Sequence, residues 1–457
     1  MKSVGPELLR QLLQDHFDLR ELREVRLEEV VDGEGVSHRA VERGHQRPLA
    51  TIFGTITTGR LAYRRRGAEN LYLADAWLNL PAERYSHGLR ELAAIESSRG
   101  SFAEAKEAIA RATGVVVGQR QVEQLAQAAS AHVDDFYESQ PRPLAEKGEV
   151  VVISADAKGV VMRPGDLRPA TAAAAAKTDH KLNSRLSKGE KANRKRMAEV
   201  ATVYTVEPVP RSPAEVMASR DDGPKQAPEA KDKWLTASVA DDAASVIAKA
   251  FAEADRRDPG HAHPWVALVD GNNHQIDRIK TEAKRRQLDI SIVVDLVHVL
   301  GYVWDAAWCF FSEGDPSAEK WVADKAIEIL NGRAGLVAAA IKRKATNLGL
   351  DPTDRKGADK CAAYLKAKAR YLDYPQALAA GFPIATGVIE GSCRYLVKDR
   401  LEVTGARWCL KGAEAILKLR AVRKNGDWPR FWSFHLAQER KRVHEPRYHN
   451  DIIPVAA

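Results

Sequence analysis

A strand-like run that ends near an acid constrains the fold of this 457-residue chain more than any other feature. Val150–Ile153 is a continuous apolar run, the pattern of a strand buried on both faces of a sheet. Small residues follow and then Asp156, where a sheet-based enzyme places a metal ligand; a turn-capping aspartate is the alternative. Gly159 predicts a tight turn, with Val160–Met162 returning as a second strand.

Two later apolar runs, Pro264–Asp270 and Ile290–Val294, lead in the same way to the acids Asp270 and Asp295. One stretch with helical periodicity precedes these two runs, and another separates them. Strands that alternate with helices and end in acids predict an α/β sheet whose site lies at the strand ends.

Changes of pattern along the chain predict its division into segments. Leu49–Arg66 has the alternation of a β-hairpin turning at Thr58-Gly59, within an N-terminal region that is otherwise mainly helical. No strand pattern recurs between Val299 and about Ala380, which predicts an all-helical insertion in the sheet domain. The predicted segments are the N-terminal region (1–140), the first part of the α/β core (148–298), the insertion (299–380), the last part of the core (381–435) and a C-terminal tail (436–457).

Composition excludes several classes of protein. No apolar run approaches the length of a membrane span, and residues 1–20 lack the apolar core of a signal peptide, so we expect a cytoplasmic protein. The four cysteines form no Cys-x-x-Cys pair, which argues against a zinc ribbon and against a disulfide framework. None of them precedes Cys309, so an N-terminal zinc ribbon is not expected.

The net charge of +8 is compatible with a nucleic-acid partner without establishing one. Basic residues are concentrated over 181–196 and 394–424, although such runs are usually solvated faces. Ser101-Phe-Ala-Glu104 is a capping box that opens a helix, and a second helix is predicted over 119–137. The pair resembles a helix-turn-helix that would place Gln119 and Arg120 on DNA; a plain helical hairpin is the alternative.

Three acids in similar settings, Asp156, Asp270 and Glu390, carry the chemistry that the sequence predicts. Carboxylates suit Mg²⁺, and three of them can hold two ions that activate a water or a 3′ hydroxyl and stabilise the leaving oxygen of a phosphodiester. For Glu390 the alternative is an acid favoured by the positive end of its helix.

The segment around Glu390 resembles the bacterial insertion-sequence transposases of the ISKra type. The resemblance runs from about Phe53 to Trp432, and its most specific parts are Gly381-Phe-Pro-Ile-Ala-Thr-Gly-Val-Ile-Glu-Gly-Ser-Cys-Arg394, Lys398-Asp-Arg400 and Thr404-Gly-Ala-Arg-Trp408. That family has an Asp-Asp-Glu triad on a ribonuclease-H-like fold. The three acids match it as Asp156 in Ser-Ala-Asp-Ala-Lys-Gly, Asp270 in Val-Asp-Gly-Asn and Glu390 in Gly-Val-Ile-Glu-Gly.

The resemblance implies a DNA transposase with a ribonuclease-H-like mixed sheet. Its cofactors would be two Mg²⁺ or Mn²⁺ ions. Its partners would be transposon-end DNA and target DNA, with a homo-oligomer assembled on DNA at the bacterial nucleoid and no membrane. The residues expected to grip phosphates are Arg394, Lys398, Arg400, Arg407 and Lys411. The alternatives are a domesticated nuclease or recombinase with the same site and a DNA-binding protein that has lost catalysis.

Two residues could be the second acid of the triad, because Asp270 and Asp295 both end buried strands. The Asp-Gly setting and the resemblance favour Asp270, while Asp295-Leu-Val-His298 looks like a signature that related transposases carry after their second acid. We therefore expect Asp295 and His298 near the site but not as metal ligands. The carboxylates of Asp156, Asp270 and Glu390 are predicted to lie within roughly 8 Å of one another.

Overall fold

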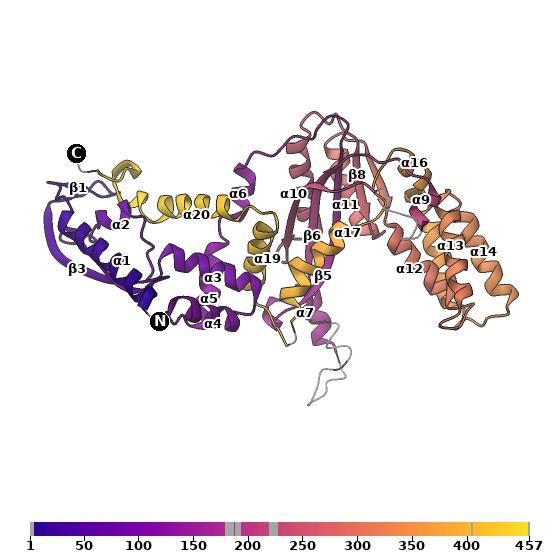
Figure 1. The fold of residues 1–457 in the computed structure, drawn as a ribbon, viewed down its shortest axis with the longest axis horizontal. Coiled ribbons are helices and arrows are strands. Elements are labelled where there is room, and N and C mark those ends of the chain that lie inside the picture. The colour runs from indigo at the N-terminus through magenta and orange to yellow at the C-terminus, as the bar shows by residue number, and fades with distance from the viewer. Residues whose placement is uncertain (1–3, 179–186, 188–192, 219–226, 404, 456–457) are drawn as a thin grey trace. The chain divides into compact units, whose positions relative to one another are not determined.

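The computed structural model describes residues 4–178, 187, 193–218, 227–403 and 405–455. The chain divides into two compact units (Figure 1). One, here the terminal unit, contains Met1–Gln140 and Trp408–Ala457; the other, the sheet unit, contains Pro141–Arg407. Within the described residues, no helix is both long and apolar enough to cross a membrane. Most of the basic run over 181–196 lies outside the described residues.

A mixed five-strand sheet forms the centre of the sheet unit and makes it an α/β structure. The order across the sheet is β7-β6-β5-β8-β9. β5 pairs antiparallel with β6 and β6 with β7, whereas β8 runs parallel to β5 and β9 to β8. The strands are β5 (Val150–Val161), β6 (Lys195–Val206), β7 (Lys231–Ser238), β8 (Trp265–Val269) and β9 (Ile290–Val294).

The predicted turn at Gly159 is wrong, because β5 continues through it to Val161. The antiparallel partner of β5 is β6, in register from Val150 opposite Val206 to Val161 opposite Lys195. Gly159 instead leaves room for the Lys195 side chain, since a Cβ atom there would lie 2.7 Å from Cδ of Lys195.

The helices between the strands follow the predicted periodicity. α10 (Ala243–Arg257) packs against β5, β6 and β7, and it buries Val246, Ile247 and Phe251. α11 (Asn273–Arg285) connects β8 to β9. Two short helices, α7 (Pro169–Ala176) and α9 (Pro213–Met217), lie in the connections that flank β6.

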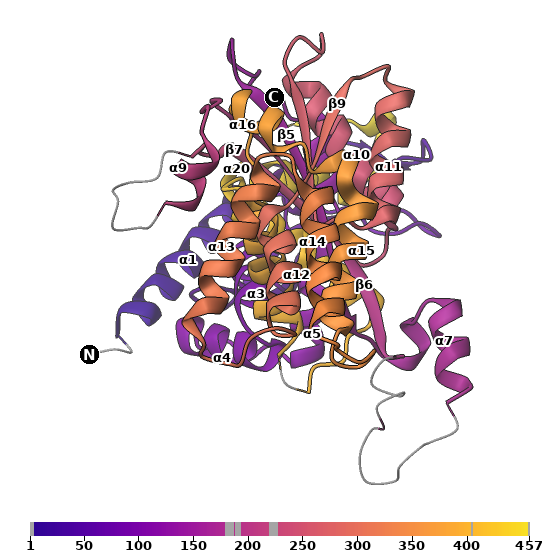
Figure 2. The ribbon, with the colours of Figure 1, turned by 90° about the vertical axis from the view of Figure 1, so that its right-hand side faces the viewer.

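The insertion after β9 is helical throughout, as predicted, although its first helix begins at Leu296. Figure 2 shows α12–α15 lying side by side as a bundle. The helices are α12 (Leu296–Ala307), α13 (Pro316–Leu330), α14 (Ala334–Asn347), α15 (Lys356–Lys368) and α16 (Tyr374–Ala379).

Glu390 lies on a helix that is irregular beside the sheet. α17 (Gly387–Ser392) passes into a π-helical stretch, Cys393–Lys398, and then into α18 (Asp399–Leu401). α17 packs against β5 and β6, and the π-helical stretch packs against β5. A π-helical stretch widens the turn locally and is frequent at functional sites.

The terminal unit begins with α1 (Val4–Arg23) and two short strands, β1 (Val30–Val31) and β2 (Ser37–His38). The predicted hairpin is present as β3 (Ala40–Thr51) and β4 (Gly54–Arg64), but it turns at residues 52–53. The predicted turn at Thr58-Gly59 is therefore wrong. Thr51 and Gly54 pair across the turn, and Gly54 supplies the positive φ (121°) that a side chain disfavours.

Helices α2 to α6 continue the terminal unit, and three of them surround one apolar core. α4 has the predicted capping box between Ser101 and Glu104 and ends at Gly114, which is left-handed. The predicted second helix is in fact two, because α5 and α6 are separated at residues 130–132. The helices are α2 (Leu73–Trp77), α3 (His87–Arg99), α4 (Phe102–Thr113), α5 (Gln119–Ala129) and α6 (Val133–Ser139).

The C-terminal residues belong with the N-terminal region, which corrects the predicted core segment 381–435 and the predicted tail 436–457. α19 (Leu410–Lys424) packs against α3 and α5, and α20 (Trp428–Val443) packs against α6. Apolar burial holds them there. Phe431 packs edge-on against Phe136, and Tyr448 and Ile453 are buried in a cluster of residues from the first 76 positions.

The buried His87 should make the terminal unit sensitive to acid. Burial, and then the Arg90 guanidinium, lower the pKa of His87 to about 4. Its Nε2–H donates to the Asn79 carbonyl at 2.7 Å. The unfolded chain protonates this histidine below a pKa of about 6.5, whereas the folded chain does so only below about 4. The neutral ring therefore contributes its full stabilisation of the folded state above pH 6.5, and this contribution is lost as the pH falls toward 4.

We expect His87 to account for about 2 kcal/mol of the stability lost between pH 7 and pH 5. Urea unfolding at both pH values, on wild type and on His87→Gln, measures this contribution. The glutamine keeps a donor for Asn79 but does not titrate, so its loss should be smaller. Equal losses in the two proteins would contradict the prediction.

Candidate functional site

One pocket of the sheet unit, about 490 Å³ in volume, brings together the three predicted acids. Asp156 comes from β5, Asp270 from the residue after β8, and Glu390 from α17. The charged and polar side chains that line the pocket are Asp156, Lys158, Asp270, Asp295, His298, Thr386, Glu390, Arg394 and Lys398.

Asp156 lies within β5, just beyond the part of the strand that pairs with a neighbouring strand on both edges. β5 pairs with β8 only from Val151 to Ser154, whereas its pairing with β6 continues past Asp156. The side chain of Asp156 is therefore partly exposed at the edge where β8 ends.

Two side chains contact Oδ2 of Asp156. The Lys158 ammonium is 3.2 Å away, and the Cys393 thiol donates to the same oxygen at 3.3 Å. Although burial opposes it, the Asp156 carboxylate raises the pKa of Lys158 above its ordinary value. Burial, and then Asp156, raise the pKa of the Cys393 thiol, so this thiol stays protonated as a donor.

Asp270 is fixed by contacts to its backbone as well as its side chain. Oδ1 accepts the N–H of Asn272 at 2.8 Å, and the backbone carbonyl accepts the Tyr364 hydroxyl at 2.9 Å. Gly271 permits this second contact, because a Cβ atom there would lie 2.4 Å from the Tyr364 hydroxyl oxygen and its φ is +91°. The helical insertion thus supports Asp270 through α15.

Asp295 lines the same pocket in a different role. It is 1% exposed, and its carboxylate caps α12 by accepting the N–H groups of Val297 and His298, each at 3.1 Å. It also accepts the N–H of Thr386 at 3.1 Å. Asp295 therefore ties the start of the insertion to the segment that leads into the Glu390 helix. His298 is exposed on the pocket wall beside Tyr302.

The three acids fit a hard divalent cation by donor type, because carboxylate oxygens are the ligands that Mg²⁺ prefers. Lys158 already places a positive charge on Asp156, which shows that this oxygen attracts a cation. The acids are nevertheless not a closed ligand set. In the part of the chain that the structure describes, only His132, His435 and Glu439 bring three ligand atoms within 4.8 Å of one another. The spacing of roughly 8 Å stays a prediction.

The predicted DNA contacts are distributed over both units. Arg394 and Lys398 are exposed on the pocket wall, and Arg407 is exposed at the end of the sheet unit. Arg400 was predicted wrongly as a phosphate contact, since it is 3% exposed: the turn of its helix directs it inward. Gln119, Arg120 and Lys411 are exposed on α5 and α19 of the terminal unit.

Sequence reasoning missed two residues that line the pocket, Lys158 and Thr386. It also missed two residues that contact the acids from behind them, Cys393 and Tyr364. Lys158 and Cys393 stand within the quoted family segments, so their proximity to an acid was the available signal. Thr386 stands in the same segment as Cys393, but its contact with Asp295 had no signal in the sequence. The contact of Tyr364 with Asp270 had none either, because both contacts join segments distant in sequence.

Comparison with known proteins gives no family for this chain. No protein-family model matches it, and no curated protein sequence matches it. The geometry of the pocket and the residues around it therefore carry the functional argument.

Proposed function

We propose that this protein is a metal-dependent DNA transposase of the Asp-Asp-Glu type. The observation that carries the proposal is the pocket shared by Asp156, Asp270 and Glu390, three acids more than a hundred residues apart in sequence. Acids so distant meet in one pocket only because the fold brings them there. The mixed five-strand sheet agrees with the ribonuclease-H-like fold that the resemblance implies.

The acidic and the basic residues that line the pocket suit different parts of phosphodiester cleavage. When bound, two Mg²⁺ or Mn²⁺ ions activate the attacking oxygen and stabilise the leaving one. Asp156, Asp270 and Glu390 would hold them, and Arg394 and Lys398 would bind the phosphates of the DNA. Lys158 would have to leave Asp156, because its ammonium contacts the oxygen that a cation would take.

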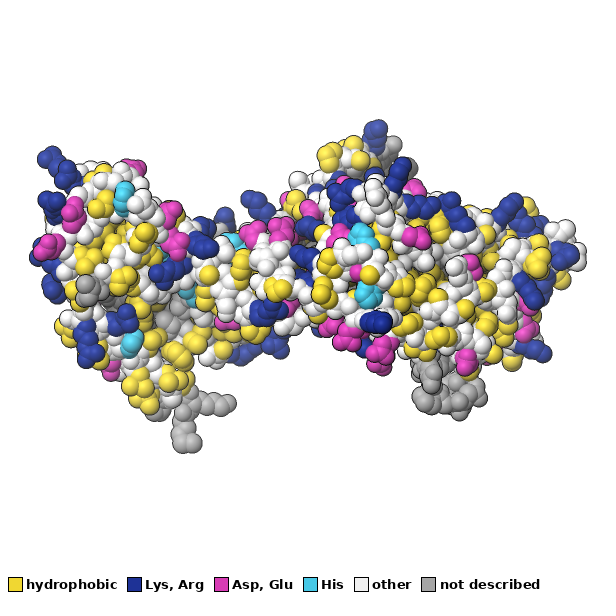
Figure 3. Space-filling view, turned by 90° about the horizontal axis from the view of Figure 1, so that it is seen from above, with side chains coloured by type: hydrophobic (Ala, Val, Ile, Leu, Met, Phe, Trp, Pro, Cys, Tyr) yellow, Lys and Arg dark blue, Asp and Glu magenta, His cyan; other side chains and the backbone are white. Residues whose placement is uncertain are grey.

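The terminal unit offers a DNA-docking element that is separate from the pocket. α3, α4 and α5 surround one apolar core, in which Leu89, Ile109 and Val122 are fully buried. This arrangement supports a helix-turn-helix role for α4 and α5, with the N-terminal residues of α5 exposed to DNA. On the face drawn in Figure 3, basic and acidic side chains are interspersed.

The test uses the DNA that flanks the gene. Inverted repeats there would identify the substrate. Purified protein incubated with a repeat-containing duplex should cut it at the repeat end with Mg²⁺ or Mn²⁺ and should not cut it with EDTA. A protein that binds the repeats without metal-dependent cleavage would be a DNA-binding protein, and the proposal would be wrong.

Arg120 should contribute to binding of the repeats. It is exposed at the start of α5, so its truncation removes a charge without disturbing the core. We expect Arg120→Ala to bind the repeat about 5-fold to 150-fold more weakly, a loss of about 1–3 kcal/mol for a base-reading arginine. Fluorescence anisotropy with repeat and random duplexes measures it. Arg111→Ala, an exposed arginine at the end of α4, is the matched control.

A further inference from the structure

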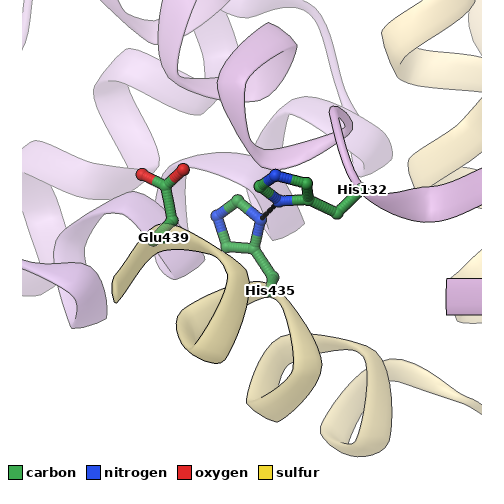
Figure 4. A group of neighbouring side chains, drawn as sticks. All are labelled: His132, His435 and Glu439. Atoms are coloured by element: carbon green, nitrogen blue, oxygen red, sulfur yellow. Dashed lines mark hydrogen bonds between the residues drawn. The ribbon is translucent and has the colours of Figure 1, made fainter. Parts of the chain in front are cut away.

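The terminal unit contains a cluster of metal-ligating side chains that the proposed transposase chemistry does not use. His132 stands at the N-terminus of α6, while His435 and Glu439 lie four residues apart on one face of α20. Figure 4 shows the two imidazole rings facing each other, with Glu439 beside His435. One ligand atom from each residue lies within 4.8 Å of the others, and His435 is 0% exposed.

Hydrogen bonding does not account for the buried histidine. The Nδ1 atoms of His132 and His435 are 3.0 Å apart, so one of them must carry a proton and the other must accept it. Among the described residues, Nε2 of His435 has no hydrogen-bond partner although it is buried. Either tautomer therefore leaves one nitrogen of His435 unsatisfied, an unfavourable state for a buried polar atom.

The donor types of the cluster suit a cation, because imidazole nitrogens and a carboxylate oxygen are common ligands of zinc in proteins. Two nitrogen ligands on one tetrahedral zinc ion lie roughly 3.3 Å apart, close to the observed separation of the Nδ1 atoms.

We propose that His132, His435 and Glu439 bind one divalent transition-metal ion, such as Zn²⁺ or Co²⁺, through one ring nitrogen of each histidine and a carboxylate oxygen. Imidazole ligands favour such ions over Mg²⁺, which separates this site from the acidic pocket. The ion would cross-link α6 to α20 and so join the two chain segments of the terminal unit. The site does not depend on the proposed transposase function.

Two arginines form ion pairs with Glu439, and their competition with the metal ion determines the affinity that we expect for the ion. Arg90 donates to Oε2 at 2.9 Å, and its side chain is only 2% exposed. Arg442 donates to Oε1 at 2.9 Å, but its side chain is 56% exposed, so water can replace it. Removing Arg442 frees a carboxylate oxygen and removes a nearby positive charge. We therefore expect Arg442→Gln to bind the ion several-fold more tightly than wild type.

The experiment measures binding of Zn²⁺ and Co²⁺ to full-length protein stripped with EDTA, by equilibrium dialysis and calorimetry. Wild type should bind one ion at this site and gain thermal stability. His132→Ala should weaken that binding by roughly a hundredfold, because it removes one of three ligands. His132 is only partly buried and its side chain makes no capping bond, so this variant should fold. His16→Ala removes an exposed histidine of the same unit and is the control.

Asp156→Asn separates the two metal sites, since it alters the acidic pocket and should leave Zn²⁺ binding at the histidine cluster unchanged. Binding that falls in His132→Ala, rises in Arg442→Gln and is unchanged in His16→Ala supports the site. If wild type binds no ion, or if His132→Ala binds as tightly as wild type, the proposal is wrong. Cleavage activity is not a readout, so failure here leaves the transposase proposal standing.

Discussion

Glu390→Gln should abolish metal-dependent DNA cleavage while leaving the fold and the binding of DNA intact. The substitution keeps the size of the side chain but removes a charged ligand, and two ions that share carboxylates cannot be held by the remaining pair. We expect a loss of about a thousandfold or more in the rate of cleavage. Glu390 is exposed, so the free energy of unfolding should change little.

Asp156→Asn and Asp270→Asn should give the same loss, because each removes a ligand of the shared ions. Glu402→Gln is the matched control, since Glu402 is an exposed glutamate just after α18. Single-turnover cleavage of the repeat duplex with Mn²⁺ measures the rates, and anisotropy measures binding. Near wild-type cleavage in purified Glu390→Gln protein would remove Glu390 from the site.

The elements that sequence predicted best are those whose pattern is local. The capping box at Ser101 and the apolar runs that became β8 and β9 needed no information from elsewhere in the chain. Turns were harder. Gly59 and Gly159 were both read as turn residues, but each lies inside a long strand where a glycine admits a neighbouring side chain. A glycine alone does not distinguish a turn from a close approach.

Long-range packing was beyond the sequence patterns. α19 and α20 follow the Glu390 helix in sequence, yet they pack on helices of the first 140 residues. The aromatic residues of α20 indicate burial without indicating a partner. The prediction for Arg400 was wrong for a similar reason. A run of basic residues does not indicate which of them lie on the buried side of the helix. The meeting of Asp156, Asp270 and Glu390 in one pocket could not be derived from their spacing, because they come from distant segments.

Asp295→Ala should destabilise the sheet unit by about 3 kcal/mol, whereas Asp270→Ala should cost less than about 1 kcal/mol. Asp295 is buried and accepts three backbone N–H groups, and one of them, from Thr386, lies on a segment distant in sequence. Without the carboxylate, the cap of α12 is lost and the buried N–H of Thr386 has no acceptor. Asp270 is only partly buried and its carboxylate accepts one nearby N–H.

Measurements of stability and of metal binding, taken together, therefore distinguish the roles of the two aspartates. Urea unfolding gives the midpoints, and the slopes should be equal if only stability has changed. Asp270→Ala should keep its midpoint and lose Mn²⁺ binding in the pocket. Asp295→Asn, which keeps an acceptor oxygen, should lower the midpoint less than Asp295→Ala and should retain Mn²⁺ binding. If Asp295→Asn instead lost Mn²⁺ binding at an unchanged midpoint, Asp295 and not Asp270 would be the second acid. The distinction holds because a buried cap acts through backbone N–H groups, whereas a metal ligand must present its oxygens to the pocket.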